Sequence, residues 1–123
     1  MYSCVCFQYF LTSFSGSTCS CGACNKFGPY YSADRQRFGC GTALVACRGS
    51  QCCKLAVTDY GPSCFVEDNA NFPVLDASFA VCEVFTGGSS CGWSDKIQIT
   101  VTPVSDADVR PFGPFKLQEG ETI

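Results

Sequence analysis

Twelve of the 123 residues are cysteine, and this count limits the possible folds more than any other feature of the sequence. A thiol density this high in a short, apolar chain is typical of proteins cross-linked by disulfides in an oxidising compartment. We therefore expect a secreted, extracellular protein in which most or all of the twelve cysteines are paired within the chain. The length allows one compact domain, so any function must reside in one small core and its loops.

A zinc site is the alternative use of these cysteines. Cys19, Cys21 and Cys24 are closely spaced, and Cys52 and Cys53 are adjacent. The remaining cysteines do not repeat a paired C-x2-C spacing, and the chain has no histidine. Disulfides are therefore favoured over zinc, and we expect no metal and no other cofactor.

The composition excludes several classes of function. Without histidine there is no Ser/His/Asp or Cys/His nucleophile system, which leaves carboxylates, tyrosine and cysteine for proton transfer. Eight basic residues face 11 acidic ones and no basic run is present, so nucleic acid is a poor candidate partner. No stretch approaches the roughly 20 apolar residues of a membrane span. We expect a soluble monomer that binds neither nucleic acid nor membrane.

The first six residues, MYSCVC, have no positively charged region and no small-residue cleavage site. They therefore do not resemble a signal peptide. Because a protein that depends on disulfides must be exported, we interpret the chain as a mature or excised segment of a secreted precursor.

The two ends of the chain are expected to lie outside its core. Residues 1–29 hold five cysteines among Ser, Gly and Thr, with one aromatic run at 7–11 that could form a strand. We expect this segment to be an extension pinned by disulfides. After residue 104 the chain becomes polar and rich in Pro and Gly, which predicts a surface or partly disordered tail over 105–123.

The middle of the chain has short β-rich runs. Runs at 42–47 and 53–58 flank a Gly-containing turn and predict a hairpin. The alternating run at 96–101 predicts a half-buried strand. Between them, the apolar spacing over 78–86 predicts one short helix that ends at Gly87.

Two aspartate motifs lie among these elements in an informative order. Cys40-Gly41-Thr42 opens one strand, Thr58-Asp59-Tyr60-Gly61-Pro62 ends the next, and Val74-Leu75-Asp76-Ala77-Ser78 leads into the helix. Over about residues 39–104 this order resembles the double-psi β-barrel superfamily of rare lipoprotein A, expansins, barwin and glycoside hydrolase family 45. With its disulfides and the segment SCGWSD at 90–95, the chain looks most similar to secreted fungal muramidase catalytic domains.

The resemblance implies an all-β fold, a small six-stranded double-psi β-barrel with one short helix. The expected barrel core covers about 38–104, and the disulfide-rich N-terminal extension completes a single catalytic domain over 1–104.

Glycoside cleavage needs a carboxylic acid as proton donor and usually a second carboxylate across the same groove. The resemblance matches Asp59 to a catalytic aspartate of lytic transglycosylases and Asp76 to the general acid of family 45. We expect both in one groove, one with a raised pKa and the other ionised, with carboxyls about 6.5 to 9.5 Å apart as in inverting enzymes. The structural alternatives are a turn residue for Asp59 and a helix N-cap for Asp76.

Further acidic residues are candidates for the site. Asp34 stands near the point where lytic transglycosylases carry a functional histidine, a departure that puts their lytic mechanism in doubt. It is either a third catalytic carboxylate or a solvent-exposed one beside Arg35 and Arg37. Glu67 and Asp68, in the loop between the two motifs, could supply a base or simply be solvated, and Glu67 could bind substrate.

Tyr60 and Trp93 are the aromatic residues expected to bind substrate, by stacking on sugar rings. The favoured function is a secreted muramidase (lysozyme) that cleaves β-1,4 bonds of peptidoglycan. The alternatives are a family 45-like endoglucanase, a non-enzymatic wall-binding protein of the expansin or barwin kind, and a protease inhibitor on the same barrel. The acidic pI near 4.7 gives no help in binding anionic walls, unless the working pH is acidic or a separate module binds the wall.

Overall fold

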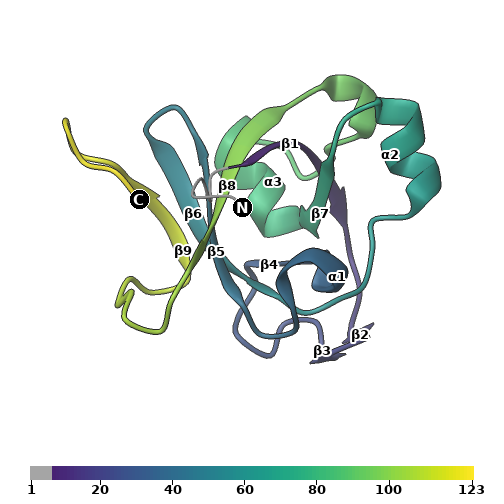
Figure 1. Cartoon of the computed structure of the whole chain (residues 1–123), viewed down its shortest axis with the longest axis horizontal. Coiled ribbons are helices and arrows are strands. Elements are labelled where there is room, and N and C mark those ends of the chain that lie inside the picture. Colours follow the sequence, from purple (N-terminus) through teal and green to yellow (C-terminus); the bar gives the residue numbers. More distant parts are fainter. Residues whose placement is uncertain (1–6) are drawn as a thin grey trace, which may run out of the picture.

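A computed structural model describes residues 7–123, and six of its strands close into a barrel (Figure 1). The strand order is β4, β7, β1, β8, β5 and β6, and β6 also pairs with β4 to close the ring. The strands are β1 (Phe7–Phe14), β4 (Tyr31–Ser32), β5 (Ala43–Arg48), β6 (Gln51–Val57), β7 (Val74–Ser78) and β8 (Gln98–Val104). The predicted all-β, six-stranded barrel is confirmed.

The N-terminal boundary of the barrel was predicted wrongly. Strand β1 runs parallel to β7 and antiparallel to β8, so residues 7–14 form a wall of the barrel and are not an extension. Tyr9 is 3% exposed and Leu11 is fully buried, which places this face of β1 in the core. The barrel therefore begins with β1 and not near residue 38. The hairpin β2 (Thr18–Cys19) and β3 (Gly22–Ala23) lies outside the ring.

The predicted hairpin and helix are both present. β5 and β6 pair antiparallel across a turn at Gly49 and Ser50, and β8 pairs with β5. Helix α3 (Phe79–Thr86) ends at Gly87, whose φ of 81° suits glycine and whose N–H donates to the Glu83 carbonyl. Three further short helices were not predicted: α1 (Arg35–Phe38), α2 (Cys64–Ala70) and the 3-10 helix η1 (Trp93–Asp95).

The barrel interior is filled by aliphatic side chains from five of its strands. Residues that are at most 1% exposed include Leu11, Leu44, Leu55, Val57, Leu75, Ile99 and Val101. They alternate along each strand with side chains that point outward, as the two-residue period of a strand requires. Among the described residues, no helix is long and apolar enough to cross a membrane.

Eight of the ten cysteines in the described region form disulfides, so the prediction of a disulfide-bonded domain is confirmed for them. The pairs are Cys19–Cys24, Cys21–Cys40, Cys47–Cys52 and Cys82–Cys91. Cys53 and Cys64 are free thiols, so complete pairing was wrong for these two. Cys53 points into the core while its neighbour Cys52 faces the other side of β6. Cys4 and Cys6 lie outside the described residues.

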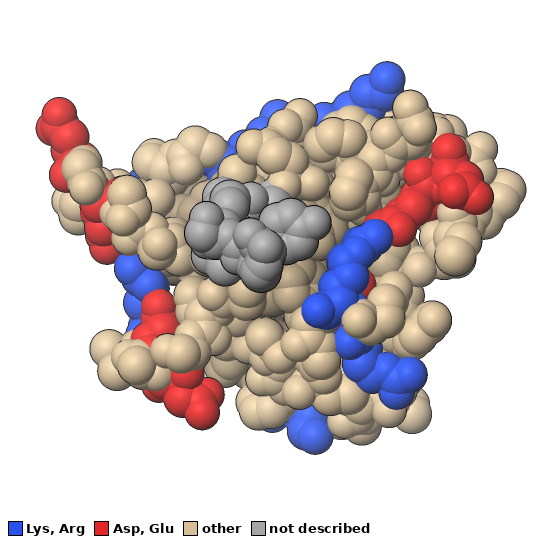
Figure 2. All heavy atoms as spheres, in the orientation of Figure 1, with Lys and Arg blue, Asp and Glu red and all other residues tan. Residues whose placement is uncertain are grey.

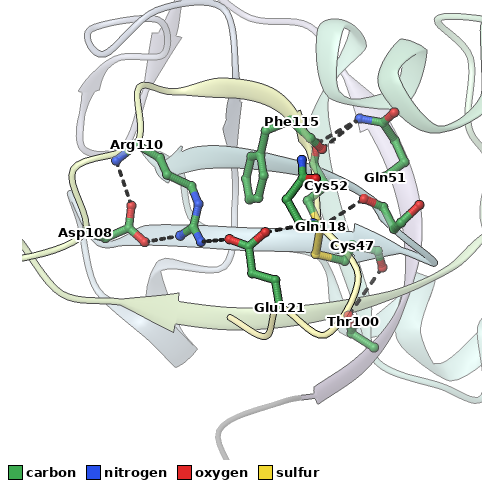
Figure 3. Close-up of a disulfide and its surroundings, with 10 residues drawn as sticks. Cys47, Gln51, Cys52, Thr100, Asp108, Arg110, Phe115, Gln118 and Glu121 are labelled. Carbon is green, nitrogen blue, oxygen red and sulfur yellow. Dashed lines mark hydrogen bonds and ion pairs between the residues drawn. A yellow bond between two sulfur atoms is a disulfide. The ribbon is translucent and has the colours of Figure 1, made fainter.

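The C-terminal segment, predicted to be a surface or partly disordered tail over 105–123, contains an ordered strand. Strand β9 (Gly113–Lys116) pairs antiparallel with β6 and adds a seventh strand to the sheet. Figure 3 shows Arg110 between the carboxylates of Asp108 and Glu121, close to the Cys47–Cys52 disulfide. The segment lies at the end of the molecule opposite α2 (Figure 1), and acidic and basic side chains lie side by side at both ends (Figure 2).

Lys54 of β6 fixes the loop before β9. Lys54 is 6% exposed. Its ammonium group donates to the carbonyls of Asp108 (3.1 Å) and Arg110 (2.8 Å) and to Asp108 Oδ1 (3.3 Å). Replacing Lys54 by Met should keep most of the volume but leave these acceptors without their donor. We expect a loss of about 1 to 3 kcal/mol in the free energy of unfolding, measured by urea denaturation. Lys116→Met, on the exposed side of β9, is the control and should change little.

Candidate functional site

A groove of about 460 Å³ opens between the ends of β1 and β7 on one side and the segment after β6, α2 and η1 on the other. The residues that line it are Thr12, Ser13, Tyr60, Gly61, Pro62, Ser63, Val66, Asp76, Cys91, Gly92 and Trp93. Asp76 is the one carboxylate among them. Both predicted aromatic residues, Tyr60 and Trp93, are in this set.

Asp76 lies in β7, where it is partly buried and lines the groove. Its Oδ1 accepts a hydrogen bond of 2.8 Å from the hydroxyl of Thr12, the residue opposite it on β1. Burial raises the pKa of Asp76; the Thr12 bond acts to lower it, and the negative charge of Asp59 raises it further. The helix-cap alternative for Asp76 is wrong, because α3 begins three residues later, at Phe79, and Ser78 occupies its N-cap position.

Asp59 lies just outside this set of lining residues. Its Oδ1 accepts hydrogen bonds from the backbone N–H groups of Ser20 (2.8 Å) and Tyr60 (2.9 Å). The backbone carbonyl of Asp59 in turn accepts from the N–H of Arg35 (3.0 Å). Asp59 therefore acts as a turn residue, which was the structural alternative predicted from the sequence. Its charge nevertheless contributes to the pKa of Asp76, so the two carboxylates interact.

Tyr60 and Trp93 offer aromatic surface to a ligand in the groove. Tyr60 is 57% exposed and Trp93 is 38% exposed, although both are large apolar side chains. Tyr60 precedes Gly61, whose φ of 107° lies in a region that side-chain-bearing residues rarely adopt. This turn holds the tyrosine at the groove wall.

Asp34 and Glu67 lie together outside the groove. Arg37 joins them, with Nη1 2.8 Å from Asp34 Oδ2 and Nη2 2.7 Å from Glu67 Oε1. The other oxygen of Glu67 accepts from the N–H of Val74 (2.9 Å), which ties α1 and α2 to the start of β7. Burial raises the pKa of Asp34, while its contacts with Arg37 oppose that shift. The solvent-exposed alternative for Asp34 is wrong, because its side chain is fully buried.

No sequence pattern predicted the polar partner of Asp76. Thr12 is 7% exposed and belongs to the segment that had been interpreted as an extension. Only the pairing of β1 with β7, across 64 residues of sequence, brings its hydroxyl to the carboxylate. Ser13 and Cys91 also line the groove, and the backbone N–H of Ser13 donates to the Cys91 carbonyl (2.9 Å). Within residues 7–123, no group of three or more His, Cys, Asp or Glu side chains is placed to hold a metal ion.

Comparison of the barrel with solved structures finds the crystal structure of an apo expansin from Clavibacter michiganensis, with a TM-score of 0.52. The match covers 82% of this chain and 51% of the expansin, at 18% sequence identity. At this identity the likeness establishes the shared fold, and it confirms the expectation of an expansin-like double-psi barrel.

Sequence comparison finds relatives over nearly the whole chain. Lysozyme B and Lysozyme A of Dictyostelium discoideum are 51% and 50% identical to it over 117 residues. Each alignment covers 93% of this chain, which spans 64% of the length of each relative. These relatives come from a slime mould and not from a fungus. A family model described as "AlyA: Lysozyme A" matches residues 3–123, and the chain therefore belongs to this lysozyme family.

Proposed function

We propose that this chain carries the catalytic groove of a secreted lysozyme that cleaves the β-1,4 glycosidic bonds of peptidoglycan. The observation that carries the proposal is Asp76, a carboxylate with a raised pKa in the wall of an open groove. The names of the relatives support the same activity, and the disulfides suit an extracellular protein. Tyr60 and Trp93 provide faces on which sugar rings stack.

In this proposal Asp76 is the general acid. A carboxyl that keeps its proton at the working pH can transfer it to the leaving glycosidic oxygen, and burial favours the protonated form. Thr12 donates its hydroxyl hydrogen to Oδ1, so Oδ2 is the atom left to carry the acidic proton. Thr12 is then a positioning residue, since it orients the carboxyl toward the groove.

Asp59 is the proposed ionised partner. Two backbone N–H groups fix the orientation of its carboxylate, and Asp59 directly precedes the groove-lining Tyr60. A negative charge there stabilises the positive charge that develops on the sugar ring in the transition state. The carboxyl separation of about 6.5 to 9.5 Å, which leaves room for an inverting water, stays a prediction.

Asp34 and Glu67 receive a different role in the proposal. Both are bonded to Arg37, and neither is among the groove's lining residues. We assign them to holding α1 and α2 in place beside the barrel, and not to contact with the reacting atoms.

The test of this function is the action of the purified protein on three polymers: peptidoglycan, chitin and soluble β-glucan. We expect release of reducing ends from peptidoglycan, strongest at acidic pH, with fragments that have gained one water by mass spectrometry. Binding to walls without any new reducing ends would favour the expansin-like alternative. Anhydro-sugar ends in place of water addition would show lytic cleavage and contradict the hydrolytic mechanism.

A further inference from the structure

Arg35, the first residue of α1, lies beside the groove without being part of its wall. Its guanidinium Cζ is 5.2 Å from the centre of the Tyr60 ring, within cation–π range. The backbone N–H of Arg35 donates to the backbone carbonyl of Asp59, which fixes the start of α1 against the turn that carries Tyr60. The groove-lining tyrosine therefore holds a positive charge at the groove's edge.

Within residues 7–123, the guanidinium group of Arg35 contacts the Tyr60 ring but no carboxylate. Arg37 and Arg110 each bridge two carboxylates, and Lys54 pairs with Asp108. In the part of the chain that the structure describes, Arg35 makes no ion pair. The nearby carboxylate of Asp59 accepts from two backbone amides instead.

The chemistry of the guanidinium group suits a carboxylate ligand. Stacking on an aromatic ring uses the flat face of the group and leaves its N–H donors at the edge free. Those donors match the two oxygens of a carboxylate in a bidentate pair. A sugar ring stacked on Tyr60 would bring its substituents within reach of this edge.

We propose that Arg35 and Tyr60 form a subsite that recognises a carboxylate on the substrate glycan. The subsite favours strands in which the lactyl carboxylate of muramic acid is free of a stem peptide, over strands in which it is amide-linked and over neutral β-1,4 glycans such as chitin or cellulose. The choice of ligand rests on the proposed function. A local cation also accounts for how a chain with a net charge of −3 can hold an anionic polymer in its groove.

The test measures binding and does not depend on cleavage. Trp93 is the only tryptophan of the chain and lines the groove, so its fluorescence reports occupancy. The Asp76→Asn protein is titrated with a tetrasaccharide of alternating N-acetylglucosamine and N-acetylmuramic acid, and with the same tetrasaccharide after its carboxylates are converted to amides. Adding Arg35→Gln should weaken binding of the carboxylate form by about tenfold and of the amide form by less than about twofold.

The matched control is Arg48→Gln, which removes an exposed arginine at the end of β5 and should change neither affinity. Equal weakening for both ligands would show that Arg35 only positions Tyr60, and it would overturn the proposal. An unchanged affinity for the carboxylate form would overturn it as well. If the parent protein binds both tetrasaccharides but does not cleave peptidoglycan, the proposed lysozyme activity is wrong. The difference in binding between the carboxylate and amide forms still tests the Arg35 subsite, because that measurement does not require cleavage.

Discussion

Replacing Asp76 by Asn is expected to lower the rate of peptidoglycan hydrolysis by about a hundred- to ten-thousand-fold, because the positioned proton donor is lost. The amide oxygen can still accept the hydrogen bond from Thr12, so the groove should keep its shape. The rate is measured from new reducing ends on purified walls. Asp68→Asn, on the exposed face of α2, is the matched control and should keep near-normal activity.

The stability of the same variant separates a chemical role for Asp76 from a structural one. Burial raises the pKa of Asp76, so the folded state binds more protons than the unfolded chain between its ordinary and raised pKa values. Stability then falls as the pH rises through that window. Asn does not ionise, so the variant should be at least as stable as the parent at neutral pH, and this advantage should vanish below the ordinary pKa. A large loss of stability at neutral pH would indicate a structural role.

Removing the Cys82–Cys91 disulfide by a double change to Ala should produce the second large effect. The bond closes a loop of sequence separation 9, and loop-closure entropy gives an expected loss of about 2 to 3 kcal/mol in the free energy of unfolding. It also joins α3 to Cys91, which lines the groove beside Trp93. We therefore expect the rate of hydrolysis to fall as well. The rate is measured under conditions in which urea denaturation shows that the variant is folded.

The control for this experiment is the Cys47–Cys52 disulfide on β5 and β6, which closes a loop of sequence separation 5 (Figure 3). Its removal should cost about 2 kcal/mol by the same argument, yet leave hydrolysis by the folded protein unchanged. If both double variants lose activity to the same degree, the effect is one of general stability and the link between Cys91 and the groove is not supported.

The sequence predicted those parts of the fold that depend on neighbouring residues. The β5–β6 hairpin and α3 follow from local alternation and from the glycine stop at Gly87. The two aspartate motifs led to Asp59 and Asp76 through their resemblance to the double-psi β-barrel superfamily; the first motif directly follows β6, and the second is β7 itself. Pairings between distant segments could not be read in this way. β1 joins β7 far along the chain, and β4 has only two residues.

The same limit applies to the site. Thr12 becomes the partner of Asp76 only through the β1–β7 register, and no local pattern marks it. Asp34 looks like an exposed acid beside two arginines, but the closure of β4 onto β6 buries it completely against Arg37. Cys53 resembles its paired neighbour Cys52, but the strand's alternation turns it into the core, where burial raises the pKa of its thiol to about 12.

Asp76 should keep its proton to a higher pH than an ordinary aspartate, because burial raises its pKa. An NMR titration of its side-chain carboxyl carbon, in the folded protein, measures this directly. We predict a midpoint above the ordinary value of 3.8, and a lower midpoint when Asp59 is replaced by Asn, because that change removes the neighbouring negative charge. A midpoint at or below 3.8 in the parent protein would contradict the assignment of Asp76 as the general acid.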